Sequence, residues 1–257
     1  MREILINFFK KDFFFVALKK IFKKFEKDTS VASLKWAILN TKFTTEELCK
    51  SIDLKLYNEI LLDVKSIEIE ASKNLSKLNV SMGGAGNYFL LYFLVRKINP
   101  NIVVETGVAA GWSSMFILKA LQKNGKGKLY SSDFPYIRKK NSKNYIGYLA
   151  KNEINKSDWF LDIRGDDIAI PEILKKIGNS SIDLFHYDSD KSYTGRDNVL
   201  KKINNKASEK TIMIFDDIQN NLHFKNLTEK TQKKFLVLEF KGKYLGIIGN
   251  HFLFKKI

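Results

Sequence analysis

The sequence predicts an α/β protein with a Rossmann-like sheet of seven strands, mostly parallel, with helices on both faces and further helices at the N-terminal end. Short apolar runs alternate with helical patterns through the second half of the chain, which is typical of parallel strands joined by right-handed crossovers. The β-branched run 102–104 leads through a glycine-containing turn into a periodic apolar segment that starts near Ser113. The runs 235–240 and 244–254, turned by Gly242, predict a closing hairpin.

Length and composition are those of a globular protein with a substantial core. The chain has 257 residues, of which 44% are hydrophobic. We divide it into an N-terminal helical lid or appendage, residues 1–80, and a main domain, residues 81–257, which holds the alternating strands and helices. The single cysteine, Cys49, excludes disulfides within the chain and a zinc site built on several cysteines. It fits a reducing, cytoplasmic compartment.

A formal net charge of +16 would suit an acidic partner such as nucleic acid or an anionic membrane. The lysines are spread along the chain rather than clustered, so we favour lysine as the default surface residue and expect no nucleic-acid partner. Phenylalanines and lysines interleave in residues 1–28, where the longest apolar run, 13–18, is too short to span a membrane. We expect amphipathic helices there that pack on the domain behind them. Peripheral contact with the inner face of an anionic membrane is the alternative, and stacking on RNA is a weaker one.

A helical pattern covers residues 30–75, in which Thr44 or Thr45 is expected to cap a helix that begins with acidic residues. Its position in front of the sheet suggests a lid over the substrate. A glycine cluster, residues 81–87, precedes a strongly apolar helix at 88–97. This cluster is either a flexible linker or a loop that closes over a ligand.

The remaining strands of the predicted parallel sheet lead into acidic side chains. They are 129–132, which ends at Asp133; 158–163, which is followed by Asp166; the strand from 181, which ends at Asp188; and 211–215, which ends at Asp216 and Asp217. In open α/β sheets the functional residues lie beyond the carboxyl ends of the strands. These acidic residues are therefore candidates for a site at one edge of the sheet.

The turn after the run 102–104 has the pattern E-x-G-x-x-x-G-x-S, formed by Glu105, Gly107, Gly111 and Ser113. The glycines let a ligand approach the backbone, and the following helix points its free N–H groups at whatever fills the turn. A dinucleotide fingerprint would need a third glycine, which is missing here. An ordinary βα turn is the alternative, but Glu105 and Ser113 favour a cofactor site.

This pattern resembles motif I of the class I S-adenosylmethionine-dependent methyltransferases. The resemblance implies an S-adenosylmethionine cofactor whose cationic amino end meets Glu105. The turn residues that would hold the rest of its methionine end are Gly107, Gly111, Trp112 and Ser113.

Asp188, Asp216 and Asp217 end two strands that we expect to be neighbours. Adjacent strands lie about 5 Å apart, so these carboxylates are expected to converge. Oxygen ligands of this kind suit magnesium or calcium. The alternative is that these residues cap the helices that follow. Their position beside a methyl donor favours a divalent metal, with Mg²⁺ as the first choice.

The run D-x-D-K-x-Y, which contains Asp188 and Lys191, is followed by F-D-D at 215–217. Together they resemble methyltransferase family 24, which includes sugar O-methyltransferases, and catechol O-methyltransferase. The resemblance spans about residues 81–254 and implies a class I methyltransferase domain. It implies the following roles: Asp133 at the cofactor ribose, Asp166 at the adenine edge, and Asp188, Asp216 and Asp217 as magnesium ligands. Lys191 stands where family 24 usually has histidine. The alternatives are a solvated turn at Asp166 and an ordinary surface lysine at a helix start for Lys191.

We therefore expect a metal-dependent O-methyltransferase that acts on a small hydroxylated acceptor, with a sugar or glycan precursor as the first guess. The metal would lower the pKa of the acceptor hydroxyl, and Lys191, beside Asp188, would take its proton. An RNA or other N-methyltransferase is one alternative, and a non-catalytic, membrane-associated cofactor-binding module is another. The oligomeric state is left open, with a homodimer as one alternative.

Overall fold

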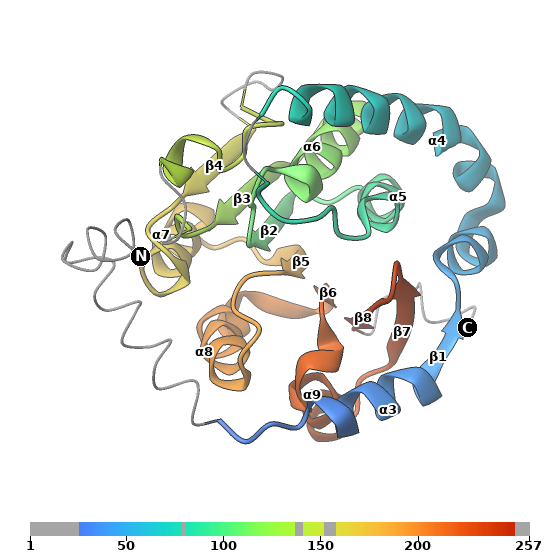
Figure 1. The fold of residues 1–257 in the computed structure, drawn as a ribbon, viewed down its shortest axis with the longest axis vertical. Helices are drawn as coiled ribbons and strands as arrows, with labels where there is room; N and C mark the ends of the chain where they lie inside the picture. Colours follow the sequence, from blue (N-terminus) through green and yellow to red (C-terminus); the bar gives the residue numbers. More distant parts are fainter. Residues whose placement is uncertain (1–25, 79–80, 137–140, 152–157, 250–257) are drawn as a thin grey trace.

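The computed structural model describes residues 26–78, 81–136, 141–151 and 158–249 (Figure 1). Its centre is an eight-stranded sheet with the strand order β1-β7-β8-β6-β5-β2-β3-β4. β8 runs antiparallel to β6 and β7, and the other neighbours are parallel. The strands are β1 (Thr41–Phe43), β2 (Ile102–Thr106), β3 (Lys128–Ser132), β4 (Trp159–Asp162), β5 (Ile182–Tyr187), β6 (Ala207–Phe215), β7 (Phe235–Phe240) and β8 (Lys243–Ile248).

The predicted Rossmann-like, mostly parallel sheet is confirmed, with one strand more than the seven expected. The additional strand, β1, has three residues and pairs with β7 at the edge of the sheet. It lies inside the stretch predicted as helical throughout, 30–75. Three residues are too few to show the alternation that distinguishes a strand from a helix.

Helices cover both faces of this sheet (Figure 1). They are α3 (Ser30–Asn40), α4 (Thr45–Leu75), α5 (Tyr88–Ile98), α6 (Trp112–Asn124), α7 (Asp166–Ile177), α8 (Tyr193–Ile203) and α9 (His223–Thr231). Short 3₁₀ turns cover Ser142–Asn144, Asn204–Lys206 and Ile218–Asn220. In the described part of the chain, no helix combines the length and apolar character needed to cross a membrane.

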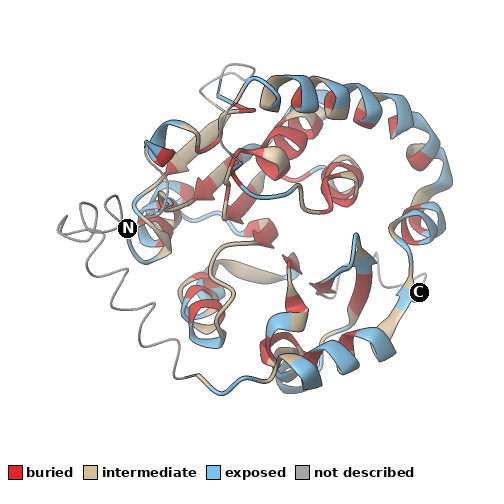
Figure 2. Ribbon diagram, viewed as in Figure 1, coloured by how far each residue is buried: buried red, intermediate tan, exposed pale blue. Residues whose placement is uncertain are grey.

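The two core layers follow from the period-two alternation of side chains along each strand. Val103 packs in the layer formed with α4, α5 and α6, whereas its neighbour Val104 packs in the layer formed with α3, α7, α8 and α9. Leu184 and Phe185 of β5 divide in the same way. Buried residues line both faces of the central strands (Figure 2). This explains why these strands are apolar at consecutive positions.

The segment predicted as an N-terminal lid shares the sheet and the core of the main domain. The buried face of α4 packs in the same layer as α5 and α6. At the start of α4 the Thr44 side chain accepts a hydrogen bond from the Glu47 amide, and the Glu47 side chain accepts one from Thr44. This confirms Thr44, one of the two predicted caps. Most of the Phe- and Lys-rich stretch 1–28, and the end of the predicted strand 244–254, lie outside the described residues.

Candidate active site

The turn between β2 and α6 is held against the exit of the neighbouring strand β5. Gly107 has φ +82°, and a Cβ placed on it would lie 2.3 Å from the main-chain oxygen of Asp188. Only glycine fits there without moving the backbone. Gly111, with φ +94°, would place its Cβ 3.0 Å from the Cα of Gly147. The two glycines of the motif are therefore required by two different neighbouring segments.

A small pocket opens beside this turn at the carboxyl end of β2. Its lining comes from three places: the glycine cluster, the turn with the first residues of α6, and the exit of β5. The lining residues are Gly84, Gly86, Gly107, Val108, Ala109, Ala110, Trp112, Ser113 and Asp188. Of the residues predicted to hold a cofactor, Gly107, Trp112 and Ser113 therefore line the pocket. Gly84 and Gly86 of the glycine cluster 81–87 contribute to this lining.

Four predicted cofactor residues are absent from this lining, and two of them belong to the motif itself. Gly111 packs against the backbone of Gly147, and Glu105 is buried at the end of β2, before the turn. Glu105 is fully buried and accepts hydrogen bonds from the hydroxyls of Ser114 (2.6 Å) and Ser131 (2.9 Å). Strand alternation places its side chain on the face covered by α6, where its carboxylate meets the Ser114 hydroxyl.

Asp133, predicted at the cofactor ribose, binds the turn itself. One of its oxygens accepts hydrogen bonds from the amides of Val108 (3.1 Å) and Ala109 (2.7 Å), and the other accepts one from the amide of Phe134 (2.6 Å). Burial raises the pKa of Asp133 to about 6, although these amides act in the opposite direction. The carboxylate therefore positions the backbone that lines the pocket.

Asp166, predicted at the adenine edge, is the first residue of α7. It accepts hydrogen bonds from the hydroxyls of Ser132 (2.5 Å) and Ser189 (2.6 Å), and burial raises its pKa. These bonds join the end of β3 to the exit of β5. Asp133 and Asp166 therefore hold together the loops around the pocket.

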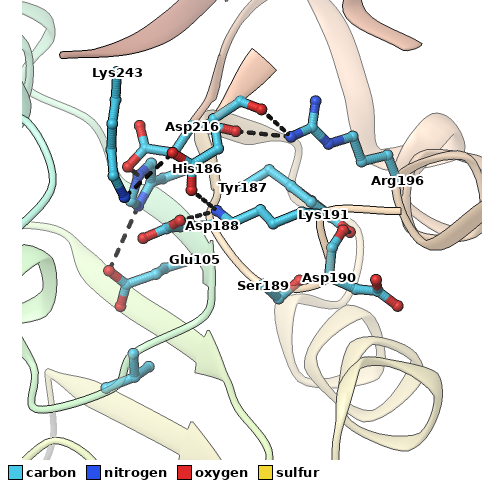
Figure 3. A network of polar contacts seen from close by, with 12 residues as sticks. Glu105, His186, Tyr187, Asp188, Ser189, Asp190, Lys191, Arg196, Asp216 and Lys243 are labelled. Carbon is cyan, nitrogen blue, oxygen red and sulfur yellow. Dashed lines mark hydrogen bonds and ion pairs between the residues drawn. The ribbon is translucent and has the colours of Figure 1, made fainter. Parts of the chain in front are cut away.

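A cluster of charged side chains lies next to the pocket, at the carboxyl ends of β5 and β6 (Figure 3). The Lys191 ammonium group donates to Asp188 and lies 3.2 Å from the second carboxylate, Asp217. Lys243, from β8, approaches the other oxygen of Asp217 at 3.3 Å. Burial and the nearby charge of Asp216 raise the pKa of Asp188 to about 6, with Lys191 acting against them. Asp188 belongs to both the cluster and the pocket lining.

His186 forms the base of this cluster, between β2 and β6. It is buried, with Nδ1 3.6 Å from Glu105 and Nε2 3.7 Å from Asp216. Burial alone would lower the pKa of the imidazole, but its interactions with Asp216 and Glu105 outweigh this and raise the pKa to about 10. His186 therefore carries a positive charge at neutral pH, and Asp216 is turned toward it.

Arg196 of α8 fixes the backbone behind the two adjacent aspartates. Its fully buried guanidinium donates to the main-chain oxygens of Asp216 and Asp217, at 2.9 Å each. Asp217 has a left-handed backbone, with φ +55°, and the two bonds hold it there. The sequence prediction omitted His186, Arg196 and Lys243. A histidine on a buried strand was the only signal available, because nothing local in the sequence places Arg196 or Lys243 near β6.

The structure brings the three predicted metal ligands to one edge of the sheet but gives each of them a protein cation. Asp188 and Asp217 face Lys191, and Asp216 faces His186. Within the ranges the structure describes, no group of three or more His, Cys, Asp or Glu side chains is arranged to hold a metal ion. Spacing along the sequence predicted that these strand ends meet, but it did not predict which way each side chain turns.

The chain is similar to known methyltransferases in part of its sequence and in its fold. Residues 104–218 match a family model described as a methyltransferase domain. No curated protein matches the sequence. An O-methyltransferase from Bacillus cereus, solved with S-adenosylhomocysteine, is 12% identical with a TM-score of 0.54, covering 72% of this chain and 90% of its own.

Two further solved structures share the fold. The O-methyltransferase TomG from Streptomyces achromogenes, solved with S-adenosylmethionine, is 12% identical with a TM-score of 0.53, covering 85% of this chain and 96% of its own. The methyltransferase PaMTH1 from Podospora anserina, solved with S-adenosylhomocysteine, is 13% identical with a TM-score of 0.54. The match covers 70% of this chain and 86% of PaMTH1. At these identities the likeness shows a common fold.

Proposed function

We propose that the chain is a methyltransferase of the class I fold, as its family match over residues 104–218 indicates, and that it transfers a methyl group from S-adenosylmethionine to an oxygen of a small hydroxylated acceptor. One observation carries this proposal: Asp188 lines the pocket and also belongs to the charged cluster. A methyl donor in the pocket would therefore lie beside groups that can bind and deprotonate a hydroxyl.

The pocket suits the methionine end of the cofactor. Gly111, at the start of α6, has no side chain that could accept hydrogen bonds from the first amides of the helix. Such a helix end attracts a carboxylate, and the Ser113 hydroxyl lines the same space. Trp112 adds an aromatic wall, which is itself packed on Tyr88 with ring centroids 5.6 Å apart. TomG and the Bacillus cereus enzyme were solved with this cofactor or its product.

Asp188 is the residue that best suits the role of proton acceptor. Methyl transfer to a hydroxyl oxygen requires that the hydroxyl proton leave. With its pKa raised to about 6, Asp188 is largely ionised at neutral pH, yet it is a stronger base than an ordinary aspartate. This role differs from the sequence-based prediction, in which Lys191 takes the proton. Lys191 instead donates to Asp188 and forms an ion pair with Asp217.

The resemblance to methyltransferase family 24 implies a magnesium ion held by Asp188, Asp216 and Asp217. The donor set does not fit that ion, because each of these carboxylates already faces a lysine or a charged histidine. We therefore derive no step through a metal.

A neutral acceptor fits the charge of the cluster. Its acidic members are Glu105, Asp188, Asp216 and Asp217, and its basic members are His186, Lys191, Arg196 and Lys243. The two sets are equal in number within the cluster, which favours an acceptor without a strong charge of its own. Sugars and glycan precursors are therefore the first acceptors to test.

The proposal is tested by following a radiolabelled methyl group from S-adenosylmethionine into a panel of sugars, catechols and RNA, with the product bond identified by NMR. We expect O-methylation of a hydroxylated small molecule, and its loss in Asp188→Asn. Methylation of RNA or of a nitrogen atom would favour the N-methyltransferase alternative. Cofactor binding without transfer to any acceptor would favour a non-catalytic module.

A further inference from the structure

We propose that the Lys191 ammonium group takes the place of a divalent cation at the acceptor site, so that methyl transfer in this chain needs no metal ion. The inference deepens the proposed function and rests on it. It is carried by the position of Lys191 between two strand ends, by the way its loop is braced, and by the charge balance of the cluster.

The Lys191 nitrogen lies between the carboxylates that end β5 and β6. It donates to Asp188 and is 3.2 Å from Asp217, so it bridges the two strand ends from which metal ligands were expected (Figure 3). Its side chain keeps 26% of its surface exposed. The ammonium group is thus held between two carboxylates on a side chain that stays partly open to solvent, the side from which an acceptor would approach.

The loop that carries Lys191 is braced at several points. The Lys191 carbonyl accepts a hydrogen bond from the Asn221 side chain at 2.7 Å, and the Asp190 carbonyl accepts one from the Tyr187 hydroxyl at 2.6 Å. Ser192 caps α8 through the Gly195 amide. A lysine on a braced loop loses less conformational freedom when it binds an acceptor than a lysine on a free surface would. The ammonium group is therefore positioned in advance.

The neighbouring cations leave no carboxylate for a metal. Lys191 pairs with Oδ2 of Asp217, and Lys243 pairs with Oδ1 of the same residue. His186 faces Asp216. Addition of Mg²⁺ to a cluster whose charges already balance would leave two uncompensated positive charges in a largely buried place, which is costly. Lys191 would have to move away before a metal could bind.

An ammonium group can perform the electrostatic part of the reaction. It has three N–H donors, of which one is used by Asp188, and Asp217 is an ion-pair partner, so a donor is left for an acceptor oxygen. A preorganised cation at that point stabilises the negative charge that develops on the oxygen as its proton leaves. The proton passes to the Asp188 carboxylate, a bond forms between the methyl carbon and the oxygen, and the carbon–sulfur bond breaks. Its electron pair stays on sulfur, which gives S-adenosylhomocysteine.

Direct metal binding tests this inference without any knowledge of the acceptor. Mn²⁺ would be titrated into the full chain and its variants and followed by electron paramagnetic resonance and calorimetry. Removal of the ammonium group in Lys191→Ala should free the carboxylates. We expect Lys191→Ala to bind one Mn²⁺ per chain at this site, at least about tenfold more tightly than the wild type does. Addition of Asp217→Asn should abolish the gain.

Lys202→Ala is the matched control, because Lys202 also pairs with an aspartate, Asp167, but lies outside the cluster. It should behave as the wild type does. Lys191→Gln is the second variant if Lys191→Ala melts early, and the melting temperature of each variant shows that it is folded. Wild-type Mn²⁺ binding that Asp217→Asn abolishes would overturn the proposal, and so would a folded Lys191 variant that gains no metal.

The same variants separate this inference from the proposed function. Calorimetry with S-adenosylmethionine tests the cofactor alone, and its failure would reject the proposed function whatever the Mn²⁺ titrations show. With a verified acceptor, transfer by the wild type should be unchanged in chelator. Transfer by Lys191→Ala should fall by about 100-fold or more and recover in part when Mg²⁺ is added. Loss of wild-type transfer in chelator would overturn the metal-independent mechanism.

Discussion

Gly107 lies so close to Asp188 that a Cβ on the glycine would be 2.3 Å from the main-chain oxygen of the aspartate. This contact presses the turn after β2 against the exit of β5. The turn lines the proposed cofactor pocket, and the exit of β5 carries the proposed proton acceptor. In the proposed reaction, backbone packing between two parallel strands would set the distance between methyl donor and acceptor. Such packing is more rigid than a contact between side chains.

Replacement of Gly107 by alanine should destabilise the fold severely, by more than about 3 kcal/mol, because a left-handed backbone and a clash with main-chain atoms act together. Gly125 is the matched control: it also has a positive φ, +71°, but nothing lies within 4 Å of its added Cβ. Gly125→Ala should cost only about 1 kcal/mol. Chemical denaturation measures both values, and equal losses would show that the contact with Asp188 is not tight.

Two adjacent serines at the start of α6 should have separable roles. Ser113 lines the pocket, so Ser113→Ala should weaken S-adenosylmethionine binding about tenfold with little change in stability. The Ser114 hydroxyl donates to the buried Glu105, so Ser114→Ala should cost about 1–3 kcal/mol of stability and leave the cofactor affinity nearly unchanged. Calorimetry and denaturation of both variants check this pair, and the reverse pattern would place the cofactor elsewhere.

The stability of the fold in acid should depend on His223. Burial and the nearby charge of Arg196 lower the pKa of His223 from 6.5 to about 4. As the pH falls through 6.5, the unfolded chain takes up a proton that the folded chain does not accept until about pH 4. The stability contribution of His223 is therefore complete above pH 6.5 and is lost between pH 6.5 and 4.

His223→Phe keeps a ring against Tyr193 and Phe215 but cannot titrate. Both proteins should lose stability between pH 7 and pH 4. The loss in His223→Phe should be smaller than the loss in the wild type by roughly 3 kcal/mol. Denaturation at a series of pH values measures the difference. Stability curves that stay parallel from pH 7 to pH 4 would show that His223 titrates normally in the folded chain.

The architecture was predictable because parallel strands buried on both faces have long apolar runs and end in turns with glycine or aspartate. β2, β3, β4 and β5 all lie within two residues of their predicted ends. The edge strand β1 was not predictable, since its three residues owe their conformation to pairing with β7 rather than to a pattern of their own. Tertiary contact decided that element.

The site was predicted less well than the fold, for a physical reason. Topology determines which strand ends meet, and so the meeting of Asp188 with Asp216 and Asp217 could be expected. The partner of each carboxylate depends on cations that arrive from elsewhere, such as Lys243 from β8. Gly111 shows the same limit: the motif marks it as necessary, but its contact with Gly147 could not be read from the sequence.

Calorimetric titration of the purified chain with S-adenosylmethionine, beside an identical titration with a nicotinamide dinucleotide, tests the central claim most directly. The pocket next to the first turn of α6 predicts binding of one S-adenosylmethionine per chain, with weaker binding in Ser113→Ala and none of the dinucleotide. Binding of the dinucleotide without binding of S-adenosylmethionine by the folded wild type would contradict the account.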